Sequence, residues 1–192
     1  VVSDKPTPQV FMAEAVRRGL VTNTNTVFPT MARATGADGA SRLVALKAVE
    51  SGYPLRGTLQ VRRQPEAAQD AIPAQGQVWV DEAVLDALDL QAGQPLALGD
   101  RALRITGVIE REPDRGAGFM NFAPRVMMNA TDLASTALVQ PASRVTWRMA
   151  VAGPADVASA YAAWAREQAE TAHLRGVQVE SLESRRPEMR QT

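Results

Sequence analysis

The sequence contains no cysteine and only one histidine, His173. Without thiols, the chain can form neither disulfides nor thiolate metal sites, and it has no cysteine nucleophile. A single histidine cannot supply two imidazole ligands to a metal, and a Ser-His-Asp triad would have to use His173. This residue lies near the end of an expected helix, where an imidazole more often stabilises the helix terminus than acts as a base. We therefore expect no catalytic residue, no metal and no cofactor.

The chain also lacks an excess of charge of either sign and any long apolar run. Its 21 basic and 21 acidic residues give a formal net charge of zero, and only Lys5 and Lys47 are lysines. No summed positive field is present to attract nucleic acid, so we expect no nucleic-acid partner. No segment approaches the roughly 18 consecutive apolar residues that a membrane-spanning helix needs. These 192 residues should therefore contain no membrane crossing.

The two ends of the chain show the same pattern of elements. Near the N-terminus, residues 1–3 read as a strand, and a helix is expected from Thr7-Pro8 to about residue 18. Near the C-terminus, we expect a strand at 144–151, a helix from 155 to about 174 and a last strand at 177–182. Two strand–helix units with material between them predict a split βαβ, ferredoxin-like sheet that carries an insertion.

The middle of the chain favours strands. Residues 20–31 and 42–49 alternate in polarity, and the small, flexible residues between them predict a hairpin. A further strand is expected at 57–63. Residues 64–76 are rich in proline, alanine and glutamine, which indicates a linker and a domain boundary. We therefore divide the chain into one discontinuous α/β subdomain, 1–63 with 141–192, and an inserted segment, 64–140, made of the linker and a β-rich lobe.

The segment 76–109 predicts a strand, a capped helical turn and a hairpin. Val84, Leu85 and Leu88 recur at helical spacing, and the carboxylate of Asp81 can cap the turn that they form. Gly99-Asp100 tolerates the positive φ of a tight reversal between two strands. None of these residues carries chemistry.

The loop that follows is the best candidate for a working surface. Phe119, Met120 and Phe122 place three large apolar side chains within four residues, directly after a glycine-rich turn and Arg115. The turn lacks the Lys-Ser/Thr of a P-loop, which argues against a phosphate site. The apolar side chains either cover the core or form an adaptable surface for a partner or lipid. We take Arg115, Phe119, Met120 and Phe122 as the candidate surface.

Three segments in this order, 43–61, 76–109 and 112–133, resemble the first extracytoplasmic domain of YbbP-like ABC transporter permeases. These permeases belong to the FtsX/MacB superfamily. The resemblance implies an α+β fold in which a discontinuous, membrane-proximal, porter-type subdomain carries an inserted, β-rich, sabre-type lobe. The split βαβ pattern agrees with this expectation.

The same resemblance implies a non-catalytic periplasmic domain of an inner-membrane protein in a Gram-negative bacterium. A separate cytoplasmic ATPase subunit would hydrolyse ATP, and the permease would convert that cycle into periplasmic movement, which is termed mechanotransmission. The expected role is export or extraction of hydrophobic or lipid-like molecules. A secreted hydrolase of thioesterase/lysophospholipase type is the expected periplasmic partner.

Two other classes of function stay open from the sequence. One is a stand-alone periplasmic module that binds a ligand or a protein, and the other is a hydrolase, which would need acid–base residues that the chain hardly supplies. Apolar helices of about 20 residues directly before Val1 and after Thr192 would favour the permease. The resemblance implies that the chain is a segment cut from between two such helices, whereas the residues at its ends fit any domain cut from a longer protein equally well.

Overall fold

The computed structural model describes residues 1–36, 38–115, 120 and 122–181. The chain forms two compact units: unit 1 comprises Val1–Thr24 and Thr146–Thr192, and unit 2 comprises Asn25–Val145. In the part of the chain that the structure describes, no helix is both long and apolar enough to cross a membrane. The fold is a mixed α+β fold with extensive strand pairing and few helices.

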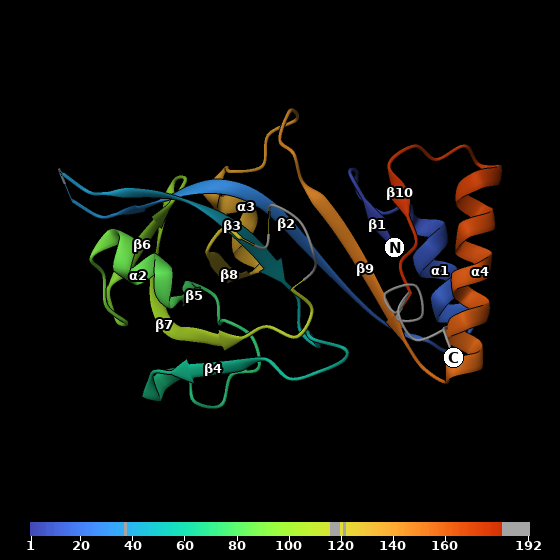
Figure 1. Ribbon diagram of the computed structural model, residues 1–192, viewed down its shortest axis with the longest axis horizontal. Coiled ribbons are helices and arrows are strands. Elements are labelled where there is room, and N and C mark those ends of the chain that lie inside the picture. Colours follow the sequence, from blue (N-terminus) through green and yellow to red (C-terminus); the bar gives the residue numbers. More distant parts are fainter. Residues whose placement is uncertain (37, 116–119, 121, 182–192) are drawn as a thin grey trace, which may run out of the picture. The chain divides into compact units, whose positions relative to one another are not determined.

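Unit 1 contains two strand–helix–strand segments (Figure 1). The N-terminal segment is formed by β1 (Val2–Ser3), α1 (Gln9–Arg17) and the start of β2 (Val21–Ala34). The C-terminal segment is formed by β9 (Thr146–Ala152), α4 (Ala155–Thr171) and β10 (Val177–Gln178). The strands follow the order β10-β1-β9-β2, so the two segments interleave in one sheet.

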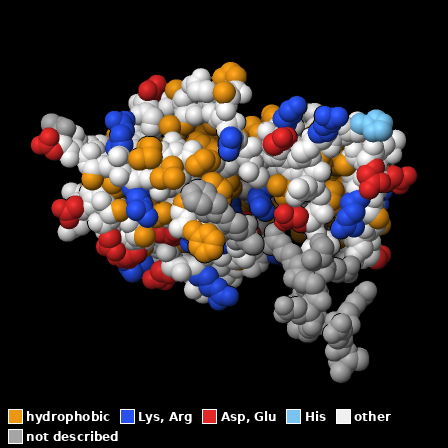
Figure 2. All heavy atoms as spheres, turned by 45° about the horizontal axis from the view of Figure 1, so that its top comes forward, with side chains coloured by type: hydrophobic (Ala, Val, Ile, Leu, Met, Phe, Trp, Pro, Cys, Tyr) orange, Lys and Arg blue, Asp and Glu red, His pale blue; other side chains and the backbone are white. Residues whose placement is uncertain are grey.

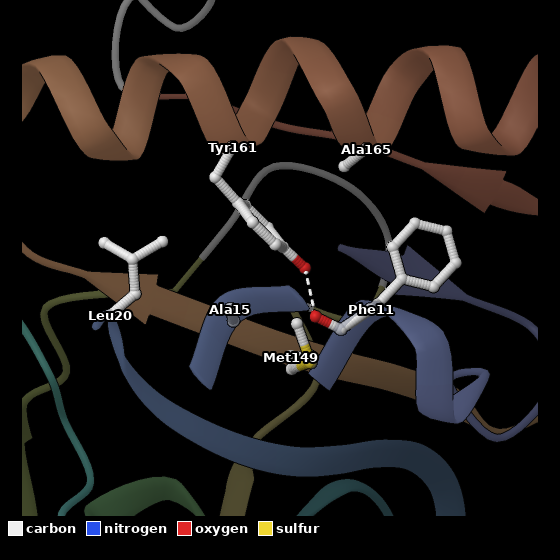
Figure 3. Close-up of a cluster of buried hydrophobic side chains, with 6 residues drawn as sticks. All are labelled: Phe11, Ala15, Leu20, Met149, Tyr161 and Ala165. Carbon is white, nitrogen blue, oxygen red and sulfur yellow. Dashed lines mark hydrogen bonds between the residues drawn. The ribbon is translucent and has the colours of Figure 1, made fainter. Parts of the chain in front are cut away.

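The core of unit 1 lies between its helices and its strands. Figure 3 shows the six buried side chains that form it, which are Phe11, Ala15, Leu20, Met149, Tyr161 and Ala165. The Tyr161 hydroxyl donates a hydrogen bond of 2.8 Å to the backbone carbonyl of Phe11, which satisfies the one polar group of that buried ring. This bond joins α4 to α1.

Two details of α1 differ from the sequence prediction. Pro8, not Thr7, occupies the N-cap position, and no side chain caps the helix there. Val16, which the periodicity placed on the apolar face, is 63% exposed, because only Phe11 and Ala15 of this helix are fully buried. Gly19 follows the helix with φ +72°, as expected for a residue that ends it in the left-handed conformation.

Unit 2 is built around a ring of paired strands. The pairing runs from β2 through β3 (Ser41–Val49), β8 (Arg125–Asn129), β5 (Gln77–Asp81) and β7 (Arg101–Arg111), and β6 (Pro95–Leu98) pairs with both β7 and β2. β2 and β3 form the expected antiparallel hairpin, whereas β3 with β8 and β5 with β7 are parallel pairs. The short strand β4 (Gln60–Arg63) extends the path beyond β7.

Short helical elements complete unit 2. The helix α2 (Glu82–Leu88) contacts β3, β5 and β7 and buries Val84, Leu85 and Leu88, the three residues that the periodicity selected. A 3₁₀ turn, Ala130–Asp132, leads into α3 (Leu133–Thr136), and a second 3₁₀ turn is formed by Pro65–Ala67.

The segment 64–76 does not connect the two units, because the residues on both sides of it lie in unit 2. Ala67 is fully buried, and the backbone N–H of Gln64 donates to the carbonyl of Thr106 at 2.8 Å. The division expected at residue 64 instead falls between Thr24 and Asn25, and the division expected at 141 falls after Val145. The physical reason is strand pairing, since β3 and β4 pair with β8 and β7 of unit 2.

Trp79 packs closely against β7 in unit 2. Its indole N–H donates to the Thr106 hydroxyl at 3.2 Å, and the pairing of β5 with β7 shifts register at this point. A β-carbon added to Gly107 would lie 2.7 Å from Trp79 Cδ1 and 2.7 Å from Val61 Cγ1. The backbone of β7 can therefore approach the indole ring only because residue 107 has no side chain.

We predict that Gly107→Ala destabilises the chain by about 1–3 kcal/mol, because the buried indole and the strand must separate to admit a methyl group. Urea unfolding should show a lower midpoint. Gly153→Ala is the matched control. Its new methyl group would meet the end of one side chain, Leu20 Cδ2 at 2.5 Å, and not an indole ring and a second side chain together, so a smaller loss than for Gly107→Ala is expected. Equal midpoints for the Gly107 variant and wild type would contradict the close packing.

Candidate functional site

Seven polar side chains of unit 2 form a continuous network that we call the ionic cluster. Its members come from β3, the turn after β3, the end of β5, the first residues after β7, and the start of β8. They are Lys47, Tyr53, Asp81, Glu112, Asp114, Arg115 and Arg125. Three cations meet three carboxylates, so the cluster carries no net charge.

Lys47 occupies the centre of the cluster and is only 2% exposed. Its ammonium donates to Glu112 Oε1 and to both carboxylate oxygens of Asp114 at 2.9 Å, and to the Tyr53 hydroxyl at 2.8 Å. The same hydroxyl donates to Asp114 Oδ1. The Lys47 ammonium also lies 4.5 Å from the centre of the Tyr53 ring. A buried ammonium needs such partners because leaving water is costly for an ion.

Glu112 links this centre to β8. Its side chain is fully buried, and its second oxygen, Oε2, accepts a hydrogen bond of 2.8 Å from Arg125 Nε. Arg125 is 3% exposed. Each oxygen of the Glu112 carboxylate thus faces a different cation, which is the arrangement that a buried carboxylate requires to stay ionised.

Asp81 links the two ends of the segment between β7 and β8. Its carboxylate accepts hydrogen bonds from the Arg115 guanidinium, one of them 3.4 Å long, and from the backbone N–H of Arg125 at 2.7 Å. The sequence prediction made Asp81 the cap of α2. It does occupy the N-cap position, but its side chain makes no capping hydrogen bond, because the carboxylate is turned toward these two arginines.

The surroundings of Glu112 and Asp114 set their pKa values. Burial opposes ionisation of both carboxyls, but attraction to Lys47, together with hydrogen bonds, outweighs it and holds both pKa values below their usual range. Burial, followed by the negative charge of Asp114, raises the pKa of Tyr53. The carboxylates therefore stay charged and the phenol stays neutral at neutral pH.

The structure places the four residues of the candidate surface differently. Arg115 belongs to the ionic cluster, with 29% of its side chain exposed. Met120 is half-buried, whereas Phe122 is 87% exposed, the highest value among the exposed large hydrophobic residues of the described part. Phe119 lies outside the described residues. Figure 2 shows hydrophobic side chains reaching the surface among basic ones.

The sequence prediction missed most of the ionic cluster. Members that bond directly to each other are separated by up to 67 residues along the chain, so no local spacing brings them together. One signal was available: Lys47, one of only two lysines, lies within the apolar strand segment Leu43–Val49. A lysine at an inward-facing position of such a strand needs a buried counter-charge, which predicts a carboxylate partner elsewhere in the chain.

Metal binding and the position of His173 are the two features that bear on catalysis. The described residues contain no group of three or more histidine, aspartate or glutamate side chains that could hold a metal ion. His173 is exposed just beyond α4, and its backbone N–H donates to the carbonyl of Glu170 at 3.1 Å. It has φ 51°, so it occupies a helix terminus in the left-handed conformation. The charged groups of the ionic cluster pair with one another, and this pairing is suited to fixing the chain at residues 112–115 and 123–125.

We predict that Lys47→Met destabilises the chain by about 3–5 kcal/mol, because Glu112 and Asp114 would stay buried without their common cation. Chemical unfolding at pH 7 measures the loss. Arg62→Met is the matched control. Arg62 and its partner Glu82 are both 60% exposed, so removing this surface ion pair should cost less than about 1 kcal/mol. Similar losses for the two variants would show that the Lys47 pairings contribute no more than a surface contact.

The lowered pKa values of Glu112 and Asp114 predict how stability depends on pH. In the unfolded chain both groups titrate near pH 4, and in the folded chain they titrate at lower pH, so unfolding takes up protons in acid. Their contribution is complete above about pH 5 and is lost as the pH falls through the folded-state values. Asp114→Asn should flatten the acid slope of the unfolding free energy by at most about 1.4 kcal/mol per pH unit. An unchanged slope between about pH 5 and 3 would contradict the assignment.

This chain is similar to known proteins in sequence and in fold. No family model matches the sequence. The chain is 36% identical, over 162 residues, to the ABC transporter permease YbbP of Escherichia coli strain K12. The match covers 84% of this chain but only 19% of YbbP, so the chain spans about a fifth of that relative.

Two solved structures have the same fold. The extracellular domain of the noncanonic ABC-type transporter YknZ from Gram-positive bacteria superposes with a TM-score of 0.57, covering 94% of this chain and 98% of that domain at 11% identity. The periplasmic region of MacB from Actinobacillus actinomycetemcomitans gives a TM-score of 0.55, covering 93% and 80% at 10% identity. The chain is therefore a homologue of part of the ABC transporter permease YbbP, with the fold of the extracellular domain of YknZ and the periplasmic region of MacB.

Proposed function

We propose that this chain is a non-catalytic extracytoplasmic domain that couples ATP hydrolysis by a cytoplasmic ATPase subunit to movement outside the membrane. The observation that carries this proposal is the 36% identity to a permease over 84% of the chain. The shared fold with the YknZ and MacB domains supports the extracytoplasmic placement. The buried charged residues of the ionic cluster form ion pairs with one another, which supports a structural role for them.

The proposal extends to the two subdomains. The strand order β10-β1-β9-β2, with α1 and α4 in the crossovers, supports a ferredoxin-like, porter-type subdomain near the membrane. The ring of strands in unit 2 would then be the inserted, sabre-type lobe. In this proposal the lobe starts at Asn25, so the β2–β3 hairpin belongs to it.

The transported molecules belong to the same proposal. We expect export or extraction of hydrophobic or lipid-like compounds, with a secreted thioesterase/lysophospholipase-type hydrolase as periplasmic partner. Phe122 supports a contact with an apolar partner, because a phenylalanine ring that is 87% exposed leaves apolar area in water that binding would remove.

The proposal predicts that Phe122→Ala lowers export by at least about threefold, a loss of roughly 0.7 kcal/mol of coupling or binding energy. The complete permease with its ATPase, reconstituted in vesicles, would be assayed for ATP-driven removal of a dansyl-labelled fatty acid, and export would be normalised to ATP hydrolysed. The melting temperature of the chain should change little, because this side chain is not in the core.

Val16→Ala is the matched control, since Val16 is also largely exposed but lies on α1 in unit 1. It should leave both export and the melting temperature near wild-type values. Normal export by a well-folded Phe122 variant would exclude this residue as a contact.

ATP hydrolysis or ester hydrolysis by the purified chain itself, lost on His173→Ala, would overturn the non-catalytic assignment.

A further inference from the structure

The segment just after Phe122 is fixed to the rest of unit 2 at three consecutive residues. The carbonyl of Ala123 accepts a hydrogen bond of 3.4 Å from the Arg115 guanidinium, and the carbonyl of Pro124 accepts one of 2.9 Å from the backbone N–H of Ala45. The backbone N–H of Arg125 donates to Asp81 at 2.7 Å. Phe122 nevertheless projects its ring into solvent. It therefore combines an exposed apolar ring with an immobilised backbone on its C-terminal side.

Such a combination favours binding. An exposed side chain on a backbone that is already ordered loses less conformational entropy when a partner immobilises it. An exposed phenylalanine on an unanchored segment would bring the same apolar area at a greater entropic cost.

We infer that Asp81 and Arg115 are positioning residues that hold the backbone next to Phe122, so that its exposed ring can contact the lipid-like molecule that the permease moves. This inference rests on the proposed function, because it assumes that Phe122 is a contact. Asp81 connects two points of the chain that flank Phe122. Its carboxylate accepts hydrogen bonds from the guanidinium of Arg115, which precedes Phe122, and from the backbone N–H of Arg125, which follows it. Arg115 then extends the link to Ala123, the neighbour of Phe122.

The alternative role of Asp81 is helix capping, for which its position at the start of α2 is suitable. The geometry disfavours that role, because no capping hydrogen bond is formed and the carboxylate is directed at Arg115 and Arg125. The two roles demand different chemistry. A cap needs any short side chain with an acceptor oxygen, and serine serves as well as aspartate. The link to Arg115 needs a negative charge with two oxygens that a planar guanidinium can reach.

The test uses Asp81→Ser, which keeps a capping side chain and removes the link, and Asp81→Asn, which keeps an acceptor for the Arg125 N–H but removes the charge. Amide hydrogen exchange is measured by NMR on the 192-residue chain. Asp81→Ser should speed exchange of the Arg125 amide at least tenfold and leave the amides of α2 unchanged, and Asp81→Asn should give an intermediate increase. Arg115→Met should increase exchange as Asp81→Ser does, whereas Arg115→Lys should restore part of the protection.

In the reconstituted transporter, Asp81→Ser and Arg115→Met should lower dansyl-fatty-acid export per ATP hydrolysed about as much as Phe122→Ala does. An Arg125 amide that exchanges as slowly in Asp81→Ser as in the wild type would show that serine replaces aspartate, as a helix cap allows, and would overturn the inference. Normal export by Asp81→Ser, together with defective export by Phe122→Ala, would also overturn it. If exchange of the Arg125 amide rises in Asp81→Ser but neither Asp81→Ser nor Phe122→Ala affects export, the contact role of Phe122 in the proposed function is what fails.

Discussion

A buried ammonium ion is the constraint on which the organisation of unit 2 depends. Lys47 lies on β3 where its side chain has almost no access to water, and an ion in that position is tolerated only if carboxylates surround it. Glu112 and Asp114 meet this need, and they lie just beyond the end of β7. The charge of Lys47 on β3 thereby determines the path of the chain after β7, although β3 and β7 are not neighbours in the sheet.

The carboxylates in turn determine the rest of the cluster. Lys47 binds only one carboxylate oxygen of Glu112. The other oxygen accepts a hydrogen bond from Arg125, at the start of β8. β8 runs parallel to β3, with Arg125 opposite Ala45 and Met127 opposite Lys47. The parallel pair and the ion pairs thus specify the same register, and a slip of one residue would move Lys47 to the other face of the sheet and separate it from its partners.

Local features of this fold could be predicted from the sequence, and long-range ones could not. The periodicity of Val84, Leu85 and Leu88 gave α2 and its buried face, and the alternation around residues 20–49 gave the β2–β3 hairpin. Asp81 was assigned to the correct position but to the wrong bond, because an N-cap aspartate and an aspartate that binds a distant arginine look identical in one sequence. The segment 64–76 had the composition of a linker, yet the burial of Ala67 and a hydrogen bond from Gln64 to β7 are decided by tertiary packing.

The ring of strands in unit 2 also bears on how the protein avoids association with itself. A strand at the end of a sheet presents unpaired N–H and C=O groups to which a strand of another molecule can add. The closure of the ring by β6 leaves β4 as the strand at the open end of the pairing path. β4 has only four residues, and two of them are the adjacent arginines Arg62 and Arg63. A second molecule that approached with its own β4 would find a very short edge lined by long charged side chains, so strand addition between copies is disfavoured.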